Sequence, residues 1–91
     1  MALPDPTWRA HPFQVGHEYE PRETFRGLTG AEFIVGKVYA LQHVCYSHYD
    51  SSTVFRFQAQ GEEPADWWWH DDEPDNLCAE RFRRLARVGA S

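Results

Sequence analysis

The residues best suited to chemistry in this chain lie in the segment DWWWHDDEPD, residues 66–75. Three consecutive tryptophans run into one imidazole and then into a run of carboxylates. Imidazole and carboxylate groups serve in metal binding and in acid–base catalysis, and an indole beside charge is typical of a recognition surface. A second segment, YSHYDSS at residues 46–52, adds tyrosine, serine, histidine and aspartate side chains.

A metal site would have to draw its ligands from both segments. The side chains that could supply nitrogen and oxygen ligands are His48, Asp50, His70 and Asp71. The motifs C-x-x-C, H-x-x-x-H and H-E-x-x-H do not occur, so two separate loops would have to converge. A small metal- or ligand-binding protein is therefore the alternative function, and we expect no cofactor.

The segment YSHYDSS could also form a catalytic loop, with Ser47, His48 and Asp50 close in sequence. Neighbouring residues on an extended chain point to opposite sides, so a nucleophile and its base would not face each other. A G-x-S-x-G motif, which presents a nucleophile on a sharp turn, is also missing. We therefore expect that the protein is not an enzyme.

A structural interpretation of residues 66–75 needs no ligand. Strand alternation would bury Trp67 and Trp69 on one face, so Trp68 and His70 would share the more exposed face. The acidic residues would favour the N-terminus of a following helix, predicted over residues 73–87 with Asp72 as its N-cap.

If the segment is instead a recognition surface, the acidic stretch 62–75 beside Trp68 is its predicted place. The predicted partner-binding residues are Trp68, His70, Asp71, Asp72 and Glu73, with Tyr46, His48 and Tyr49 as neighbours.

Composition narrows the class of partner. The chain has 91 residues, enough for one small domain, and a formal net charge of −5. Seven acidic residues and no basic residue lie between Gln60 and Asn76. Such a surface is repelled by phosphate backbones, so we expect a basic protein partner and no nucleic acid.

The sequence also indicates where in the cell the protein is expected. No stretch has the length of a membrane span or the pattern of a signal peptide, so we expect a cytoplasmic protein that does not bind membranes. In that setting Cys45 and Cys78 are expected to be reduced core residues.

Sequence patterns also predict the elements that position these residues. Residues 1–12 form an irregular arm, and residues 13–91 form a single β-rich domain. The motif F-x-V-G-x-x-Y occurs at residues 13–19 and again at residues 33–39, and in both places predicts a turn before a strand.

Alternation predicts strands over residues 37–46, 53–60 and 66–70. In the first of these strands it places Tyr39, Leu41, His43 and Cys45 on one face, and Val38, Ala40, Gln42 and Val44 on the other. The helical spacing of Leu77, Cys78, Phe82 and Leu85 predicts that the C-terminal helix packs on the sheet.

This order predicts an α+β, mostly β fold: a small, strongly bent antiparallel sheet or SH3-like half-barrel of four or five strands with one C-terminal helix. The motifs F-x-V-G-x-x-Y, YSHYD, FRF and WWWHDDEP resemble a group of small, uncharacterised bacterial domains, over roughly residues 13–85. That resemblance implies a compact β-structure ending in a short helix, and no known activity. Taken together, the sequence predicts a non-catalytic protein-interaction module, one form of which is an inhibitor-like or immunity-type protein that binds a basic partner.

Overall fold

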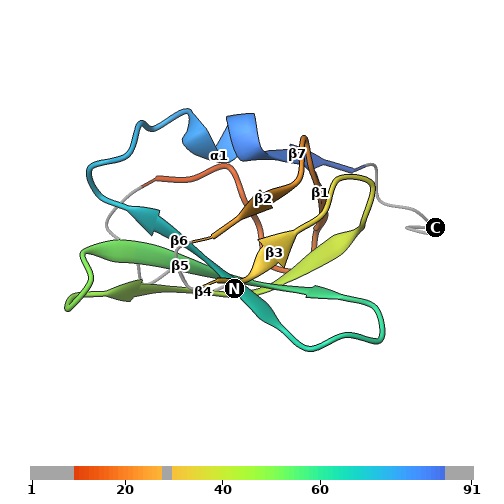
Figure 1. Ribbon diagram of the computed structural model, residues 1–91. Coiled ribbons are helices and arrows are strands. Elements are labelled where there is room, and N and C mark those ends of the chain that lie inside the picture. Colours follow the sequence, from red (N-terminus) through yellow and green to blue (C-terminus); the bar gives the residue numbers. More distant parts are fainter. Residues whose placement is uncertain (1–9, 28–29, 86–91) are drawn as a thin grey trace.

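The computed structural model describes residues 10–27 and 30–85 of the chain. A bent, five-stranded antiparallel sheet in the order β6-β5-β4-β1-β7 forms the body, and β2 pairs with β3 in a separate two-stranded sheet (Figure 1). The elements are β1 (Glu18–Pro21), β2 (Phe25–Arg26), β3 (Glu32–Phe33), β4 (Tyr39–Ser47), β5 (Ser52–Ala59), β6 (Ala65–His70), α1 (Leu77–Arg81) and β7 (Phe82–Arg84). The predicted fold class is therefore confirmed. Of the predicted N-terminal arm, residues 1–9 lie outside the described part of the chain.

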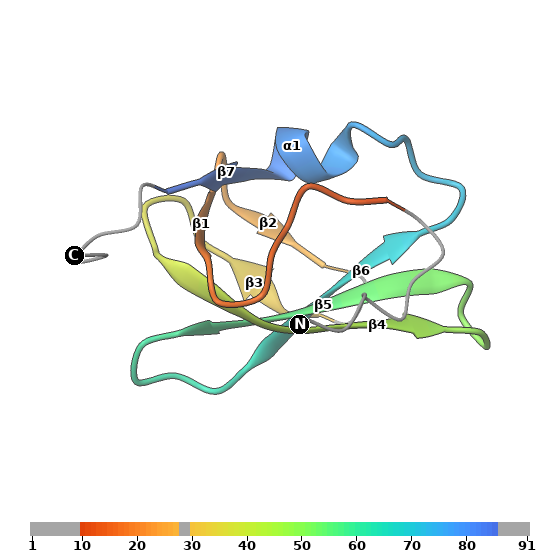
Figure 2. The ribbon, with the colours of Figure 1, turned by 180° about the vertical axis from the view of Figure 1, so that it is seen from behind.

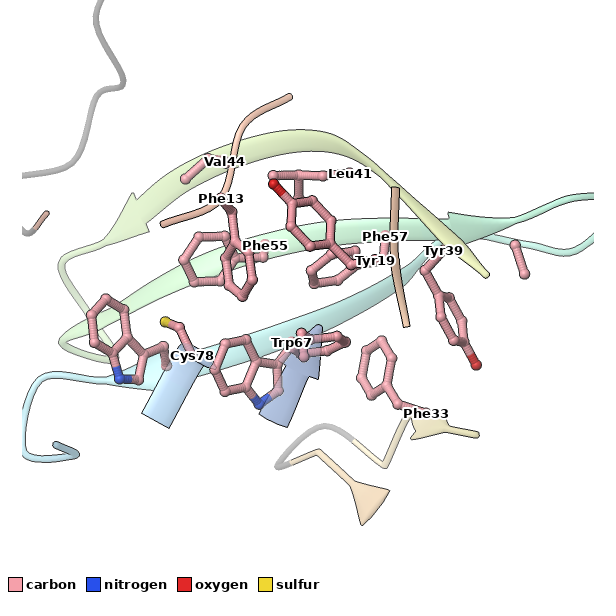
Figure 3. Close-up of a cluster of buried hydrophobic side chains, with 13 residues drawn as sticks. Phe13, Tyr19, Phe33, Tyr39, Leu41, Val44, Phe55, Phe57, Trp67 and Cys78 are labelled. Atoms are coloured by element: carbon pink, nitrogen blue, oxygen red, sulfur yellow. The ribbon is translucent and has the colours of Figure 1, made fainter. Parts of the chain in front are cut away.

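The two faces of the five-stranded sheet have different surroundings. The β2–β3 hairpin, α1 and the segment before β1 cover one face, here called the inner face (Figures 1 and 2). Phe13, from the segment before β1, inserts its ring among Tyr19, Phe55 and Phe57 (Figure 3). The outer face carries no helix or strand of the described chain.

Aromatic side chains fill the core on the inner face. Phe55 and Phe57 on β5 and Trp67 and Trp69 on β6 are all buried, as strand alternation predicts. The ring of Phe57 stacks on that of Phe82 at a centroid distance of 4.6 Å. Fully burying one such ring stabilises the fold by about 1.5–3 kcal/mol, which explains how so short a chain holds a core.

The two F-x-V-G-x-x-Y segments adopt the same local structure. In each, the glycine has a positive φ, +93° at Gly16 and +88° at Gly36, which is the requirement for the third position of a type II turn. In each motif the tyrosine hydroxyl accepts a hydrogen bond from the backbone N–H of the residue five positions earlier, which is the first residue of the turn. Tyr19 Oη accepts the N–H of Gln14 at 2.8 Å, and Tyr39 Oη accepts that of Ile34 at 3.1 Å. Each motif is thus a turn that is pinned to the strand that follows it.

A β-bulge in the middle of β4 changes the predicted faces of that strand. Leu41 pairs with Phe57 and His43 pairs with Arg56, so Gln42 is left without a partner on β5. After this extra residue the alternation is reversed, and Val44 points into the core. The prediction that His43 and Cys45 share a face with Tyr39 and Leu41 was therefore wrong: His43 and Cys45 line the outer face, whereas Tyr39 and Leu41 are buried in the core.

The C-terminal helix is much shorter than the predicted range 73–87. It spans Leu77–Arg81 with Asn76 as the N-cap, so the prediction of Asp72 as N-cap was also wrong. The chain then continues as β7, in which Phe82 pairs with Pro21 and Arg83 with Glu20. The strand satisfies the backbone groups of β1, buries Phe82 and forms the Arg83–Glu20 ion pair. The free energy gained from this pairing and burial outweighs the intrinsic preference of these residues for a helix, because helix propensities differ by at most about 0.7 kcal/mol per ordinary residue.

Two further features follow from this arrangement. Both cysteines carry thiols; Cys78 is buried in the core, whereas Cys45 is half-buried on the outer face, so its prediction as a core residue was wrong. No helix in the described part of the chain is long and apolar enough to cross a bilayer.

Candidate interaction surface at one end of the sheet

The two chemistry-bearing segments of the sequence meet at one end of the sheet. The turn between β4 and β5 and the loop between β6 and α1 lie at this same end (Figure 1). The backbone N–H of Asp71 donates to the carbonyl of Ser51 at 2.9 Å, which extends the β5–β6 pairing into the two loops. The predicted convergence of residues 46–52 with residues 70–73 is therefore present. We call these residues, with Trp68, the hairpin–loop surface.

A side-chain hydrogen bond joins the end of β4 to the loop between β6 and α1. The hydroxyl of Tyr46 donates to Asp71 Oδ2 at 2.6 Å, a length typical of a hydrogen bond to a carboxylate. The other oxygen, Asp71 Oδ1, is buried and has no hydrogen-bond partner among the described residues. The carboxylate is thus held in place by one oxygen, while the second keeps its capacity to accept a hydrogen bond.

The β4–β5 turn carries two further aromatic side chains, His48 and Tyr49. The ring of His48 meets that of Tyr46 edge to face, with centroids 5.0 Å apart. Tyr49 is fully exposed at 102% of its reference area, although tyrosine carries a large apolar ring. The turn itself is ordered by Ser47 Oγ, which donates to Asp50 Oδ2 at 2.9 Å, and by Ser51 at φ +49°. A fixed turn therefore presents an exposed ring at its tip.

The acidic residues after β6 form a local turn instead of a helix start. Glu73 Oε1 accepts the backbone N–H of His70 at 2.9 Å, and His70 Nδ1 accepts the backbone N–H of Asp72 at 3.3 Å. The Asp72 carboxylate lies 3.5 Å from His70 Nδ1, and its side chain is 93% exposed. Glu73 therefore shapes the loop, whereas Asp72 presents its charge to solvent.

Trp68 lies on the outer face, as alternation predicts, beside residues that the sequence did not single out. Cys45 pairs with Val54 and Val54 with Trp68, so these three form one row across β4, β5 and β6. Val54 is buried between its two neighbours, and a shallow hollow of about 350 Å³ opens over the row. The indole Nε1 of Trp68 is buried and has no hydrogen-bond partner among the described residues. Only the strand register, which the bulge alters, could have identified Cys45 and Val54 as neighbours of Trp68.

The eight predicted site residues are therefore divided between two sides of the sheet. Tyr46 pairs with Thr53, and Thr53 with Trp69, so the Tyr46 side chain lies on the inner side at the end of the core. Trp68 and His70 lie on the outer side. The exposed Tyr49 and Asp72 lie at the end of the sheet, where the two sides meet. The surface wraps around the end of the sheet and is not a single flat patch.

The acidic stretch 62–75 is not continuous in space. β6 separates Glu62 and Glu63, in the β5–β6 turn, from the acidic residues of the β6–α1 loop (Figure 1). Glu62 forms an ion pair with Lys37, and this contact raises the pKa of Lys37 above its ordinary value. Asp66 forms an ion pair with Arg56 at 2.9 Å. The acidic residues therefore form two groups at opposite ends of the sheet, and not the single acidic surface that the sequence predicted.

The residues considered for a metal site and for a catalytic loop can be compared with the geometry of the described chain. Within residues 10–27 and 30–85, His, Cys, Asp and Glu side chains do not gather in any group of three or more that could hold a metal ion. Asp50 accepts a hydrogen bond from Ser47, and Asp71 accepts one from Tyr46. The hydroxyl of Ser47 is thereby bonded to a carboxylate, with no imidazole between them.

Comparison with known proteins identifies a fold neighbour. No family model matches the chain, and no curated protein sequence matches it. The solved structure of an integron cassette protein from the mobile metagenome of Vibrio cholerae is similar, with a TM-score of 0.64. The match covers 81% of this chain and 87% of that chain at 17% sequence identity, so it shows a shared fold and nothing beyond it. The resemblance to uncharacterised bacterial domains remains a prediction.

Proposed function

We propose that this protein is a non-catalytic protein-interaction module that binds its partner through the hairpin–loop surface. The observation that carries the proposal is the Tyr46–Asp71 hydrogen bond of 2.6 Å, which joins the end of β4, where the β4–β5 turn begins, to the β6–α1 loop. A surface whose loops are fixed before binding loses less conformational entropy on association. Tyr49 and Asp72, which protrude from these loops, are then presented in a defined geometry.

The composition of the surface supports a basic partner. Its charged side chains are Asp50, Asp71, Asp72 and Glu73, and it contains no lysine or arginine. Its aromatic members, above all Tyr49 and the half-buried Trp68, are of the types that dominate binding energy at protein interfaces. An acidic rim of this kind speeds association with a positively charged protein and excludes negatively charged ones.

The concrete form that we propose is an inhibitor-like or immunity-type protein that covers a basic toxin or enzyme. Such a role requires a small, rigid, acidic domain and needs no catalytic group of its own. The short pinned loops and the aromatic core meet the requirement for rigidity.

A matched pair of charge reversals tests the proposal. Asp72→Lys reverses a fully presented charge on the surface, and Glu23→Lys makes the same change in the exposed connection between β1 and β2. Both proteins and the wild type are used as bait in extracts of the source organism. We expect one basic protein to be enriched by the wild type and by Glu23→Lys, and lost with Asp72→Lys.

The dissociation constant then provides the second measurement. With the purified partner, Trp68→Ala should weaken binding by about 2 kcal/mol, or roughly 30-fold, if the indole is a hot spot. Equal enrichment by both charge reversals, or an acidic partner, would refute the proposal.

A further inference from the structure

A second feature of the outer face lies at the opposite end of the sheet from the hairpin–loop surface. It is a hollow of about 650 Å³, lined by Glu18, Val38, Ala40, Gln42, Gln58, Ala59, Gln60, Gly61 and Leu85. Glu18 pairs with Ala40, and Ala40 with Gln58, so the three side chains form a row across β1, β4 and β5. The hollow exists because the central residue of this row is alanine, while larger side chains surround it. We call it the Ala40 hollow.

The carboxylate of Glu18 in this hollow has no counter-ion among residues 10–27 and 30–85. Within the described chain, Glu18 forms no ion pair and its side chain makes no hydrogen bond. Other carboxylates of the same sheet differ: Glu20 is paired with Arg83, and Asp66 with Arg56. No lysine or arginine is among the lining residues, so the half-buried carboxylate of Glu18 faces the hollow without a cationic partner in the described part of the chain.

The rest of the lining suits the stem of a long side chain. Val38, with 42% of its surface exposed, and Ala40 provide an apolar floor. On the far wall Gln42 Nε2 donates to Gln58 Oε1, and Gln58 Nε2 donates to the carbonyl of Glu62. These bonds hold the glutamines in place and leave the carbonyl oxygen of Gln42 available as an acceptor.

We propose that the Ala40 hollow receives an arginine or lysine side chain of the basic partner. The methylene stem packs on Val38 and Ala40, the cationic head pairs with Glu18, and its remaining N–H groups reach the glutamine wall. This inference rests on the proposed function, because it assigns a second contact to the same partner. β5 has eight residues and spans about 25 Å, which is within the width of a standard interface, so one partner lying along the outer face reaches both ends.

Blocked pentapeptides test the hollow without knowledge of the partner. The probes carry one arginine, one lysine or one citrulline among alanines, and binding to the full-length protein is followed by amide NMR shifts at millimolar peptide. Citrulline has the shape of arginine without its charge. We expect the arginine and lysine peptides to shift the amides of Val38, Ala40 and Gln42 most, and the citrulline peptide to bind at least about fivefold more weakly.

Three variants assign the effect to the hollow. Glu18→Gln removes the charge and Ala40→Leu fills the space, and each should reduce the affinity for the arginine peptide at least about fivefold. Glu23→Gln removes the same charge outside the hollow and should leave the affinity unchanged. If the Ala40→Leu protein does not fold, the affinity of the Glu18→Gln protein for the arginine peptide is sufficient to test the inference. Equal affinities of Glu18→Gln and wild type, or of the citrulline and arginine peptides, would overturn the inference.

The position of the shifts separates this inference from the proposed function. Shifts confined to residues 70–73 would overturn the Ala40 hollow as a binding site and leave the hairpin–loop surface standing. Shifts at neither end would overturn the inference and also contradict the basic character of the proposed partner.

Discussion

Tyr19 and Tyr39 are paired residues on the neighbouring antiparallel strands β1 and β4. Each hydroxyl accepts the backbone N–H five residues earlier, at Gln14 and at Ile34 respectively. The two F-x-V-G-x-x-Y segments therefore meet at their tyrosines in one sheet, each carrying its own glycine turn. The repeat in the sequence is explained by architecture, because each copy starts a strand and seals the core beside it.

Removal of either hydroxyl should weaken the fold by a similar amount. Tyr19→Phe and Tyr39→Phe each keep the ring in the core but leave one amide without its acceptor, which should cost about 1 kcal/mol. Urea unfolding monitored by tryptophan fluorescence measures the loss. Tyr49→Phe is the control, since that hydroxyl lies on a fully exposed ring, and its midpoint should not move. Wild-type stability in both core variants would show that the hydroxyl bonds are dispensable.

The turn glycines provide an independent test of the same motif. Gly16→Ala places a side chain at φ +93° with open space around it, so its cost is backbone strain of about 1–2 kcal/mol. Gly27→Ala is the control because its φ is not positive and the nearest atoms are 3.7–3.8 Å from an added methyl group. Denaturant unfolding of both variants should show the larger loss at Gly16. The reverse order would contradict the assigned turn.

Replacing each of the three tryptophans of β6 should lower the stability of the protein by a different amount. Trp67 and Trp69 are buried to 4% and 0% exposure, and replacement of either by alanine should destabilise the protein by about 3–5 kcal/mol. Trp68→Ala should cost clearly less, because its ring is half-buried on the outer face. Thermal and chemical unfolding of the three variants will give the order. A loss at Trp68 equal to that at Trp69 would place all three indoles in the core.

Strand alternation was sufficient to predict the positions of the three tryptophans. It requires only that one face of β6 be buried, and the face with Trp67 and Trp69 carries the larger apolar area. The convergence of Tyr46 with Asp71 was also accessible, because short connections make β4, β5 and β6 antiparallel neighbours. The presence of strands over residues 37–46, 53–60 and 66–70 followed from the same local rules.

The features that the sequence could not predict depend on contacts between distant segments. The bulge at Gln42 reverses the faces of Cys45 and Val44, and no local pattern marks it. Phe82 has helical spacing from Cys78, yet pairing with Pro21 makes it a strand residue. The Ala40 hollow likewise depends on which residues of β1 and β5 lie beside one alanine. In each case the pairing register between two strands determines where the side chain lies, and a single segment of sequence does not contain that information.

The two thiols should differ in reactivity. Cys45 is half-buried on the outer face and should react with a thiol reagent in the native state. Cys78 is fully buried and should react only when the protein unfolds. Mass spectrometry of the labelled protein, with and without denaturant, distinguishes one label from two. Two labels in the native state, or a mass two hydrogens short of the dithiol form, would contradict this arrangement.

The most direct measurement of the proposed interaction is site-specific photo-crosslinking in cells of the source organism. A photoreactive amino acid replaces Tyr49 or Asp72 on the hairpin–loop surface, and Thr24, in the exposed β1–β2 connection, as the control. Binding through the hairpin–loop surface predicts that Tyr49 and Asp72 capture the same basic protein and that Thr24 captures none of it. Capture of that protein from Thr24 alone, with none from Tyr49 or Asp72, would contradict the proposed surface.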